Sequence, residues 1–515
     1  MTLAFHGNRK LTLIAPVVAL CIICVCPCAL AQEEGPMGSE AALRQTITEL
    51  ESRIAQLESG PPSEPAAGGS GVNPTTGGTA DTAPDPLQFE SIVDRIAALE
   101  ANTEALSSLE TEFLETPSSD AQRSTTGRLH LDYWAFPRDS TGINTIEGGA
   151  PSRSPQDRFE LRRIRIGIRG TVPPENVTYQ LDLEFSGVDQ VQVRDAWIGL
   201  AGVPVFDTIR IGNQKRPYGL DQLNSSNFTV FIERPLVIEA VNDPNRRLGV
   251  QAFGATADNR WNWRYGVFHQ QTIEDTGVIS NDKYQPELAG RLATTPWFES
   301  DGAYHNYLHL GVANSFAFPA RDAIGSSARF RARPEARTVA RWLDTGNITG
   351  TDSYQLLIAE AVLNLGPVQF GGEYVGSWMQ RGTSFGPSLF FQGGYVYASW
   401  FLTGESLPWN RTLGILGRVE PNRPFIHAGH RSDCASESGA GAWQVAARLS
   451  ATDFNDDNVF GGRGRSATLA VNWYWNSHTR LQFNYIVGQI EDRMEGGSLV
   501  SGDYQIAGTR LMIDY

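Results

Sequence analysis

From Arg128 to the end of the chain, hydrophobic and polar residues alternate with a period of two. Successive side chains of an extended strand point to opposite faces, so this alternation is typical of strands that separate two environments. Ile166 and Ile168 would share one face, for example, and Arg163 and Arg165 the other. The pattern predicts sixteen strands, at 128–136, 159–170, 176–186, 191–200, 206–212, 247–255, 261–269, 287–297, 305–316, 353–365, 367–378, 390–402, 441–452, 465–475, 478–490 and 503–515.

The lengths of the connections alternate along the chain as well. Connections after even-numbered strands are mostly short, as at 171–175 and 256–260, whereas those after odd-numbered strands include 213–246 and 317–352. An even number of strands, with turns on one side and long loops on the other, is typical of outer-membrane barrels. We therefore expect an all-β fold, a 16-stranded antiparallel transmembrane β-barrel over 128–515, preceded by short periplasmic coiled-coil helices. A soluble β-sandwich or propeller is the alternative.

The first 31 residues have the features of a signal peptide (1–31). Arg9 and Lys10 precede an apolar run, and Ala29-Leu30-Ala31 has the form of a signal-peptidase site. Four of the five cysteines lie in this segment, which leaves Cys434 alone in the exported protein and unable to form an internal disulfide. A lipoprotein anchored through Cys28 is an alternative that the preceding proline disfavours.

Two heptad patterns follow the signal peptide. The coiled coils are expected at 39–59 and 89–115, with a Pro/Gly-rich linker at 60–88 between them. Residues 53–58 (RIAQLE) and 95–100 (RIAALE) repeat one arrangement, which resembles a trimer-specifying motif of short coiled coils. The pairing of Ile at a with Leu at d would by itself favour a dimer. Helices lying on the barrel or the cell wall are a further alternative.

Charge is distributed unevenly along the chain. The formal net charge is −15 and only three residues are lysine, so almost all the positive charge is carried by arginine. An acidic protein of this kind is not expected to bind nucleic acid. Between Ser327 and Arg341, however, Arg329, Arg331 and Arg333 alternate with apolar residues and would point the same way. Such a row fits either a path for a mobile anion or a solvated basic loop.

Aromatic residues mark the expected membrane boundaries. The chain ends on Tyr515, with Leu511 and Ile513 on the same face, which resembles the assembly signal of outer-membrane proteins. Aromatic girdles flank the apolar band of such barrels. The candidate girdle residues are Trp400, Trp409, Trp473, Tyr474 and Trp475.

Several segments of the barrel region resemble one known family, the phosphate-selective porin O and P family. They are FELRRIRIGIRG (159–170), IRIGNQKRPYGLDQLNSSNFTVFIER (209–234), YVYASWFLTGE (395–405), GAWQVAARLS (441–450) and LAVNWYWN (469–476). The resemblance implies a homotrimeric outer-membrane channel that passes phosphate and related inorganic anions, contacts membrane lipid and uses no cofactor. It does not cover the coiled coils.

The resemblance also implies roles for particular residues. An arginine ladder on a long surface loop would guide anions inward, and here it corresponds to Arg329, Arg331, Arg333 and Arg337. The implied constriction corresponds to Arg162, Arg163, Asp195, Ser225, Ser226 and Gln222. Phosphate-specific members have lysine at the last of these positions, and an amide attracts anions less strongly than an ammonium group. The long connection 403–440 is implied to fold into the lumen.

An enzyme and a structural protein are the alternatives to a channel. The chain contains no Walker or HExxH motif, so neither an enzyme nor a metal site is expected. A structural protein would instead hold the cell wall through the coiled coils, and cell-wall contact is compatible with a channel too. Deleting residues 39–115 separates the two, because a channel would still conduct.

Overall fold

The computed structural model describes the barrel region of the chain. The chain divides into two compact units, Met1–Thr103 and Glu104–Tyr515. The predicted signal peptide, both coiled coils and the linker lie outside the described residues, as does Cys434, so these stay predictions. The described residues are 123–173, 176–187, 191–242, 245–273, 284–301, 304–319, 327–425 and 439–515.

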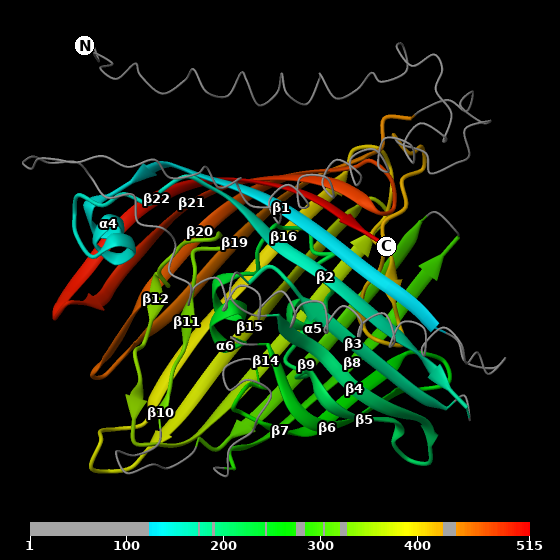
Figure 1. Cartoon of the computed structure of the whole chain (residues 1–515), viewed down its shortest axis with the longest axis horizontal. Coiled ribbons are helices and arrows are strands. Elements are labelled where there is room, and N and C mark those ends of the chain that lie inside the picture. Colours follow the sequence, from blue (N-terminus) through cyan, green and yellow to red (C-terminus); the bar gives the residue numbers. More distant parts are fainter. Residues whose placement is uncertain are drawn as a thin grey trace, which may run out of the picture. The chain divides into compact units, whose positions relative to one another are not determined.

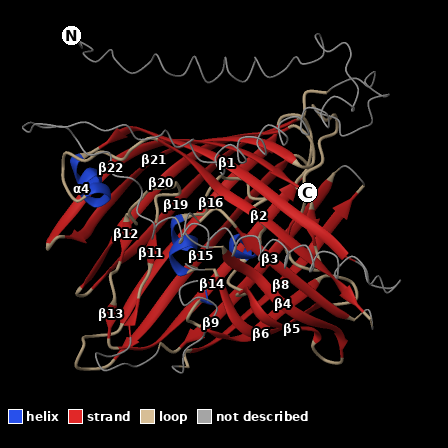
Figure 2. Ribbon diagram, in the orientation of Figure 1, coloured by secondary structure: helices blue, strands red, loops and turns tan. Residues whose placement is uncertain are grey.

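Within these ranges, sixteen antiparallel strands form one closed barrel (Figures 1 and 2). The first strand closes on the last, with Leu129 opposite Ile513. Every predicted strand is present, so the predicted fold is confirmed. The strands are β1 (Arg123–Asp139), β2 (Arg158–Val172), β3 (Val177–Glu184), β4 (Gln192–Val203), β5 (Asp207–Lys215), β6 (Arg246–Ala255), β7 (Trp261–His269), β8 (Pro286–Ser300), β9 (His305–Ala317), β14 (Thr351–Leu365), β15 (Val368–Arg381), β16 (Leu389–Phe401), β19 (Ala442–Asp456), β20 (Val459–Tyr474), β21 (Thr479–Glu495) and β22 (Ser498–Asp514).

The two faces of the strands differ as the alternation predicts. Ile166 and Ile168 on β2 are exposed on the outer surface, whereas Arg163 and Arg165 are buried inside the barrel. Tyr515 at the chain end is exposed as well. Apolar side chains outside and charged side chains inside fit a barrel that is surrounded by lipid.

Two of the predicted girdle residues point into the barrel instead. Trp400 and Trp473 lie on outward positions, but Tyr474 is buried, because consecutive residues of a strand face opposite sides. Trp409 is buried too and stacks on Tyr307 with 5.1 Å between the ring centroids. It belongs to a connection that folds inward, which strand alternation cannot reveal. The girdle prediction was wrong for these two residues.

Four connections carry the remaining elements of the described chain, and the first of them, between β1 and β2, contains α4. The inner loop (216–245) joins β5 to β6 and contains α5 (Leu220–Leu223) and α6 (Leu236–Val241). The arginine loop (318–350) joins β9 to β14 and forms two short antiparallel strand pairs, one nested within the other. The return segment (402–441) joins β16 to β19. The further elements are α4 (Thr141–Gly148), β10 (Ser327–Ala328), β11 (Arg331–Ala332), β12 (Leu343–Asp344), β13 (Ile348–Thr349), β17 (Trp409–Asn410) and β18 (Ile415–Leu416).

The helices are short. None of those in the described part of the chain is long and apolar enough to cross a membrane. Figure 1 shows α5 and α6 among the barrel strands, in the region where the inner loop crosses the lumen.

Candidate functional site

The inner loop spans the lumen and is held by side chains of the far wall. The carbonyl oxygen of Val230 accepts hydrogen bonds from Asn472 on β20 (2.8 Å) and Gln482 on β21 (3.3 Å). The carbonyl oxygen of Ile232 accepts one from Arg510 on β22 (2.6 Å). Buried backbone carbonyls need such partners, so polar wall residues fix the path of this loop.

The start of the inner loop is fixed to a different wall. The backbone N–H groups of Leu220 and Asp221 donate to the two carboxylate oxygens of Glu373 on β15, at 2.9 and 2.8 Å. Gly219 has a φ of 120°, and a Cβ atom there would lie 2.3 Å from Glu373 Oε2. Only glycine fits this approach. Because β15 and β22 both hold the loop, it divides the lumen.

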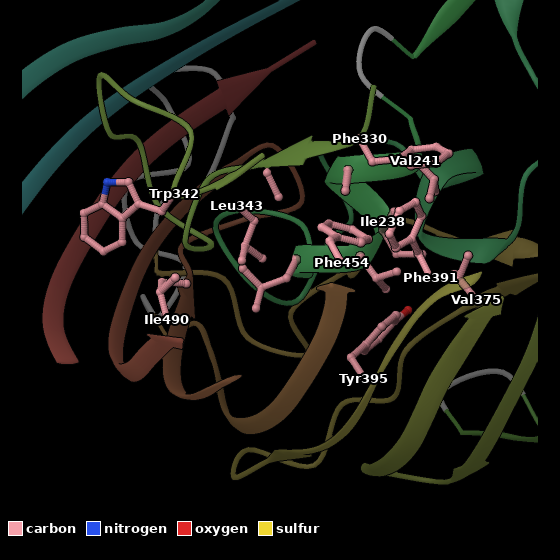
Figure 3. Close-up of a cluster of buried hydrophobic side chains, with 14 of the residues drawn as sticks. Ile238, Val241, Phe330, Trp342, Leu343, Val375, Phe391, Tyr395, Phe454 and Ile490 are labelled. Atoms are coloured by element: carbon pink, nitrogen blue, oxygen red, sulfur yellow. The ribbon is translucent and has the colours of Figure 1, made fainter. Parts of the chain in front are cut away.

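An apolar cluster inside the barrel joins the inner loop to the arginine loop (Figure 3). The arginine loop contributes Phe330 and Leu343, and α6 contributes Ile238 and Val241. Burial of each such side chain contributes about 1.5–3 kcal/mol, so both loops are anchored within the lumen. The wall residues that pack here include Val375, Phe391, Tyr395, Phe454 and Ile490.

The predicted alternation of the arginine ladder is confirmed. Phe330 and Ala332 are buried in the apolar cluster. Arg329 is exposed, and Arg331 and Arg333 are half-buried on the opposite face. The extended backbone around β11 therefore separates the guanidinium groups from the apolar anchor.

Three ladder arginines are paired with fixed carboxylates. Each carboxylate comes from a different element, namely β12, α6 and β2, so the mutual repulsion of the arginines is offset locally. The pairs are Arg329 Nε with Asp344 Oδ1 (2.7 Å), Arg333 Nη1 with Glu239 Oε1 (3.4 Å) and Arg337 Nε with Glu160 Oε1 (3.2 Å).

The inner end of the ladder approaches the predicted constriction. Burial lowers the pKa of Arg337, and the positive charges of Arg162 and Arg333 lower it further. Arg337 is thus electrostatically coupled both to the ladder and to the first constriction arginine. Arg337 also pairs with Glu160, two residues before Arg162, so the predicted ladder and the predicted constriction are neighbours.

A β-bulge explains how two consecutive arginines can face the lumen. In the β1–β2 pairing, His130 lies opposite Arg163 and Leu131 opposite Leu161, so Arg162 is the additional residue. Arg163 Nη1 lies 3.3 Å from His130 Nδ1. The Arg162 side chain pairs with Glu233 on the inner loop. The bulge thereby places both predicted arginines in the lumen, which regular alternation does not allow.

The other predicted constriction residues lie on or near the inner loop. Asp195 on β4 accepts a hydrogen bond from Arg246 Nε on β6 (2.8 Å). Ser226 Oγ accepts one from Arg128 Nη1 on β1 (3.0 Å), and Ser225 Oγ accepts one from the backbone N–H two residues later (3.3 Å). The hydroxyl of Ser226 therefore stands beside a guanidinium group.

Gln222 does not face open space. Its side chain has no exposed surface, and its amide nitrogen donates to Asn245 O at 2.9 Å. The nearby Lys215 donates to the carbonyl oxygens of Leu223 and Asn224 at 3.1 and 2.8 Å. These polar groups hold the inner loop in place.

Several central residues escaped the sequence interpretation. Glu233 on the inner loop pairs with both Arg162 and Arg510. Arg510 precedes the outward-facing Leu511, so alternation indicates that it faces inward. Glu233 lies in a loop without a repeating pattern, and nothing in the sequence indicates its partners. The same holds for Glu335 on the arginine loop, whose carboxylate pairs with Arg448 on β19.

A small cavity lies where these groups meet. Its volume is about 30 Å³, which accommodates only one or two water molecules. Loop residues and wall residues both line it, including Arg163, Ser226, Glu233, Arg234 and Arg448.

The return segment enters the lumen from the short-turn side. The carbonyl oxygen of Gly414 accepts a hydrogen bond from Arg291 on β8 (2.9 Å). The backbone N–H of Leu416 donates to Asn224 Oδ1 on the inner loop (3.0 Å). The part of this segment around Gly414 and Leu416 thus folds inward and meets the inner loop.

A closed barrel with an apolar exterior and a lumen lined by paired arginines defines a porin of the outer membrane. The family model for phosphate-selective porin O and P matches residues 125–515. The chain belongs to this family. A search of curated proteins found no match.

Solved structures of other outer-membrane proteins are similar to the chain. A loop L8 deletion mutant of OmpT from Vibrio cholerae has 10% identity and a TM-score of 0.46, over 77% of this chain and 99% of that chain. The outer membrane channel DcaP of Acinetobacter baumannii has 9% identity and a TM-score of 0.44, over 78% and 99%. OmpF of Salmonella typhi, in a complex with daunomycin, has 11% identity and a TM-score of 0.42, over 78% and 100%.

Proposed function

We propose that this porin is a passive, anion-selective channel whose preferred cargo is phosphate. The observation that carries the proposal is the run of guanidinium groups from the arginine loop, through Arg337, to Arg162 and Arg163 in the lumen. Planar guanidinium groups donate paired hydrogen bonds to oxyanions. In a series of guanidinium groups, a moving anion can pass from one group of N–H donors to the next, so it keeps hydrogen-bond donors as it loses water.

The pairing of these arginines supports transport rather than permanent binding. A lone buried arginine would hold an anion tightly, whereas an arginine shared with a carboxylate such as Glu160 or Glu239 binds it more weakly. Conduction requires sites that are favourable enough to enter and weak enough to leave. The preference for phosphate is supported by the family name alone. A porin for small anionic solutes in general is the alternative.

Planar-bilayer recording tests the proposal. Under a potassium chloride gradient, we expect a reversal potential on the anion-selective side. Phosphate added to chloride should then reduce the chloride current at a lower concentration than an equally charged organic anion does. A cation-selective reversal potential would overturn the proposed function, and equal block by both anions would favour the general porin.

We further propose a homotrimer whose amino-terminal coiled coils lie in the periplasm. The two repeated heptad motifs support this arrangement, and the exposed barrel surface provides contacts with lipid. Cell-wall contact through the coiled coils is part of the same proposal. Chemical cross-linking in outer membranes, followed by gel electrophoresis, should yield bands of one, two and three subunits and none larger.

A further inference from the structure

We propose that Glu233 is a tethered occupant of an anion-binding site formed by Arg162 and Arg510. A permeating oxyanion would bind to these two guanidinium groups by displacing the Glu233 carboxylate. The inference rests on the proposed anion transport and adds to it the position of one binding site and the group that competes for it.

The Glu233 carboxylate makes the contacts that a bound oxyanion would make. Arg162 donates from Nε to Oε1 at 2.7 Å and from Nη2 to Oε2 at 3.1 Å. Arg510 Nη2 also donates to Oε1, at 2.7 Å. Three N–H groups from two guanidinium groups converge on one carboxylate, and two oxygens of phosphate or sulfate would fit the same donors.

The site persists when the carboxylate leaves. Arg510 is fixed independently by Asp132 on β1, with Nε to Oδ1 and Nη2 to Oδ2 distances of 2.7 Å each. It also donates to Ile232 O, one residue before Glu233. Arg162 is directed into the lumen by the β-bulge. Both donors therefore come from the barrel wall, and the inner loop supplies the Glu233 carboxylate and the Ile232 carbonyl oxygen.

Charge and space both favour displacement. Arg162, Arg163 and Arg510 lie together against the carboxylates of Asp132 and Glu233, so an anion that takes the place of Glu233 still meets an excess of positive charge. The neighbouring cavity of about 30 Å³ is too small for phosphate while Glu233 occupies the site. An oxyanion of that size can bind here only if this carboxylate moves.

The test measures block of chloride current by phosphate in the full-length channel. Glu233→Gln keeps the size of the side chain and removes the competing charge, so the half-blocking concentration should fall about tenfold, which corresponds to about 1.4 kcal/mol. Glu233→Asp keeps the charge and should behave like the unmodified channel. The matched control is Glu287→Gln, which removes another buried carboxylate that holds the inner loop, through Arg216 at 2.8 Å.

The control separates a specific site from a general effect. Glu287→Gln should leave the half-blocking concentration within about twofold of the unmodified channel. This variant also removes one ion pair of the inner loop, but the pair lies outside the site formed by Arg162 and Arg510. Equal shifts in both variants, or no shift in Glu233→Gln, would overturn the inference. Arg162→Gln removes two donors and should weaken the block, which provides a second test if Glu233→Gln does not assemble. A cation-selective unmodified channel would instead overturn the proposed function.

Discussion

Arg448 on β19 and Glu335 on the arginine loop form a buried ion pair inside the barrel, with 2.7 Å between Nη2 and Oε2. Glu335 has a φ of 58°, which is uncommon for a residue other than glycine. Thr468 donates to the same carboxylate oxygen at 2.9 Å, and Arg448 also donates to Glu233 O at 3.1 Å. One wall arginine thus connects the arginine loop and the inner loop.

Glu335→Gln should loosen the arginine loop. Removing one partner of a buried ion pair costs about 3–5 kcal/mol, because the remaining charge stays buried. We expect faster hydrogen exchange in residues 330–342 and more current fluctuation in single channels. Glu299→Gln, at an exposed position on β8, is the control and should change neither. Unchanged exchange in Glu335→Gln would show that the apolar cluster alone holds the loop.

Neutralising the arginine ladder should reduce anion current mainly at low salt. With Arg329, Arg331, Arg333 and Arg337 all changed to Gln, we expect a severalfold lower conductance at 0.01 M chloride, where the Debye length is about 30 Å. At 1 M, where it is about 3 Å, the difference should nearly vanish. Arg260→Gln, in the turn between β6 and β7, is the control. A loss of current independent of salt would point to collapse of the loop instead.

Gln222→Lys tests the position where related channels carry lysine. Gln222 is fully buried and donates to Asn245 O. An ammonium group at this position would therefore be buried, and its hydrogen-bond partner would be a carbonyl oxygen rather than a carboxylate. We expect a loss of several kcal/mol in the free energy of unfolding and no tighter phosphate block. Gln222→Met, uncharged and of similar size, should lose only about 1 kcal/mol. Tighter block with unchanged stability would show that the side chain reaches the channel.

The pH dependence of sulfate block tests the ionisation of Glu233. Burial alone would raise the pKa of Glu233, but Arg162 and Arg510 hold it well below its ordinary value of 4.5. A lowered folded-state pKa means that the ion pairs stabilise the protein fully above that ordinary value and are lost only as the pH falls through the lower one. Sulfate block should therefore stay constant from pH 8 down through pH 4.5 and become tighter only as the pH approaches the lowered pKa of Glu233. A transition near neutral pH would contradict this assignment.

Deleting residues 39–115 should separate assembly from conduction. We expect fewer cross-linked trimers in the membrane, since the repeated heptads would no longer hold the subunits together. Single-channel conductance should remain within about twofold, because the barrel and its inner loops are intact. A severalfold change in conductance would mean that the amino-terminal segment takes part in the channel.

The barrel was predictable because strands that separate lipid from a polar lumen must alternate. Each side chain on β2 or β22 faces either lipid or the lumen. Because Ile166 and Leu511 are apolar and face outward, the residues next to them in the strand are expected to face inward. The same rule indicated that Phe330 and Ala332 oppose the ladder arginines. It failed at Trp409, which lies in an inward-folding connection, and it could not reveal the bulge that turns Arg162 inward.

The site was predicted less completely than the fold. The ladder and constriction arginines came from a resemblance to a family, but the sequence did not indicate that Glu239 and Glu160 pair with them. It also did not indicate that Gln222 is buried. Residues far apart in the chain meet because of the conformation of the loops, and no local sequence pattern indicates that conformation.

The sequence by itself determined the sixteen-stranded barrel and, apart from the bulge at Arg162, which strand residues face inward, because both follow from a local period of two. Only the tertiary structure decided that the inner loop crosses the lumen, that Glu233 occupies the space between Arg162 and Arg510, and that Glu335 reaches Arg448. These contacts depend on where an irregular backbone comes to rest inside the barrel, and that position is set by buried hydrogen bonds and ion pairs to distant strands.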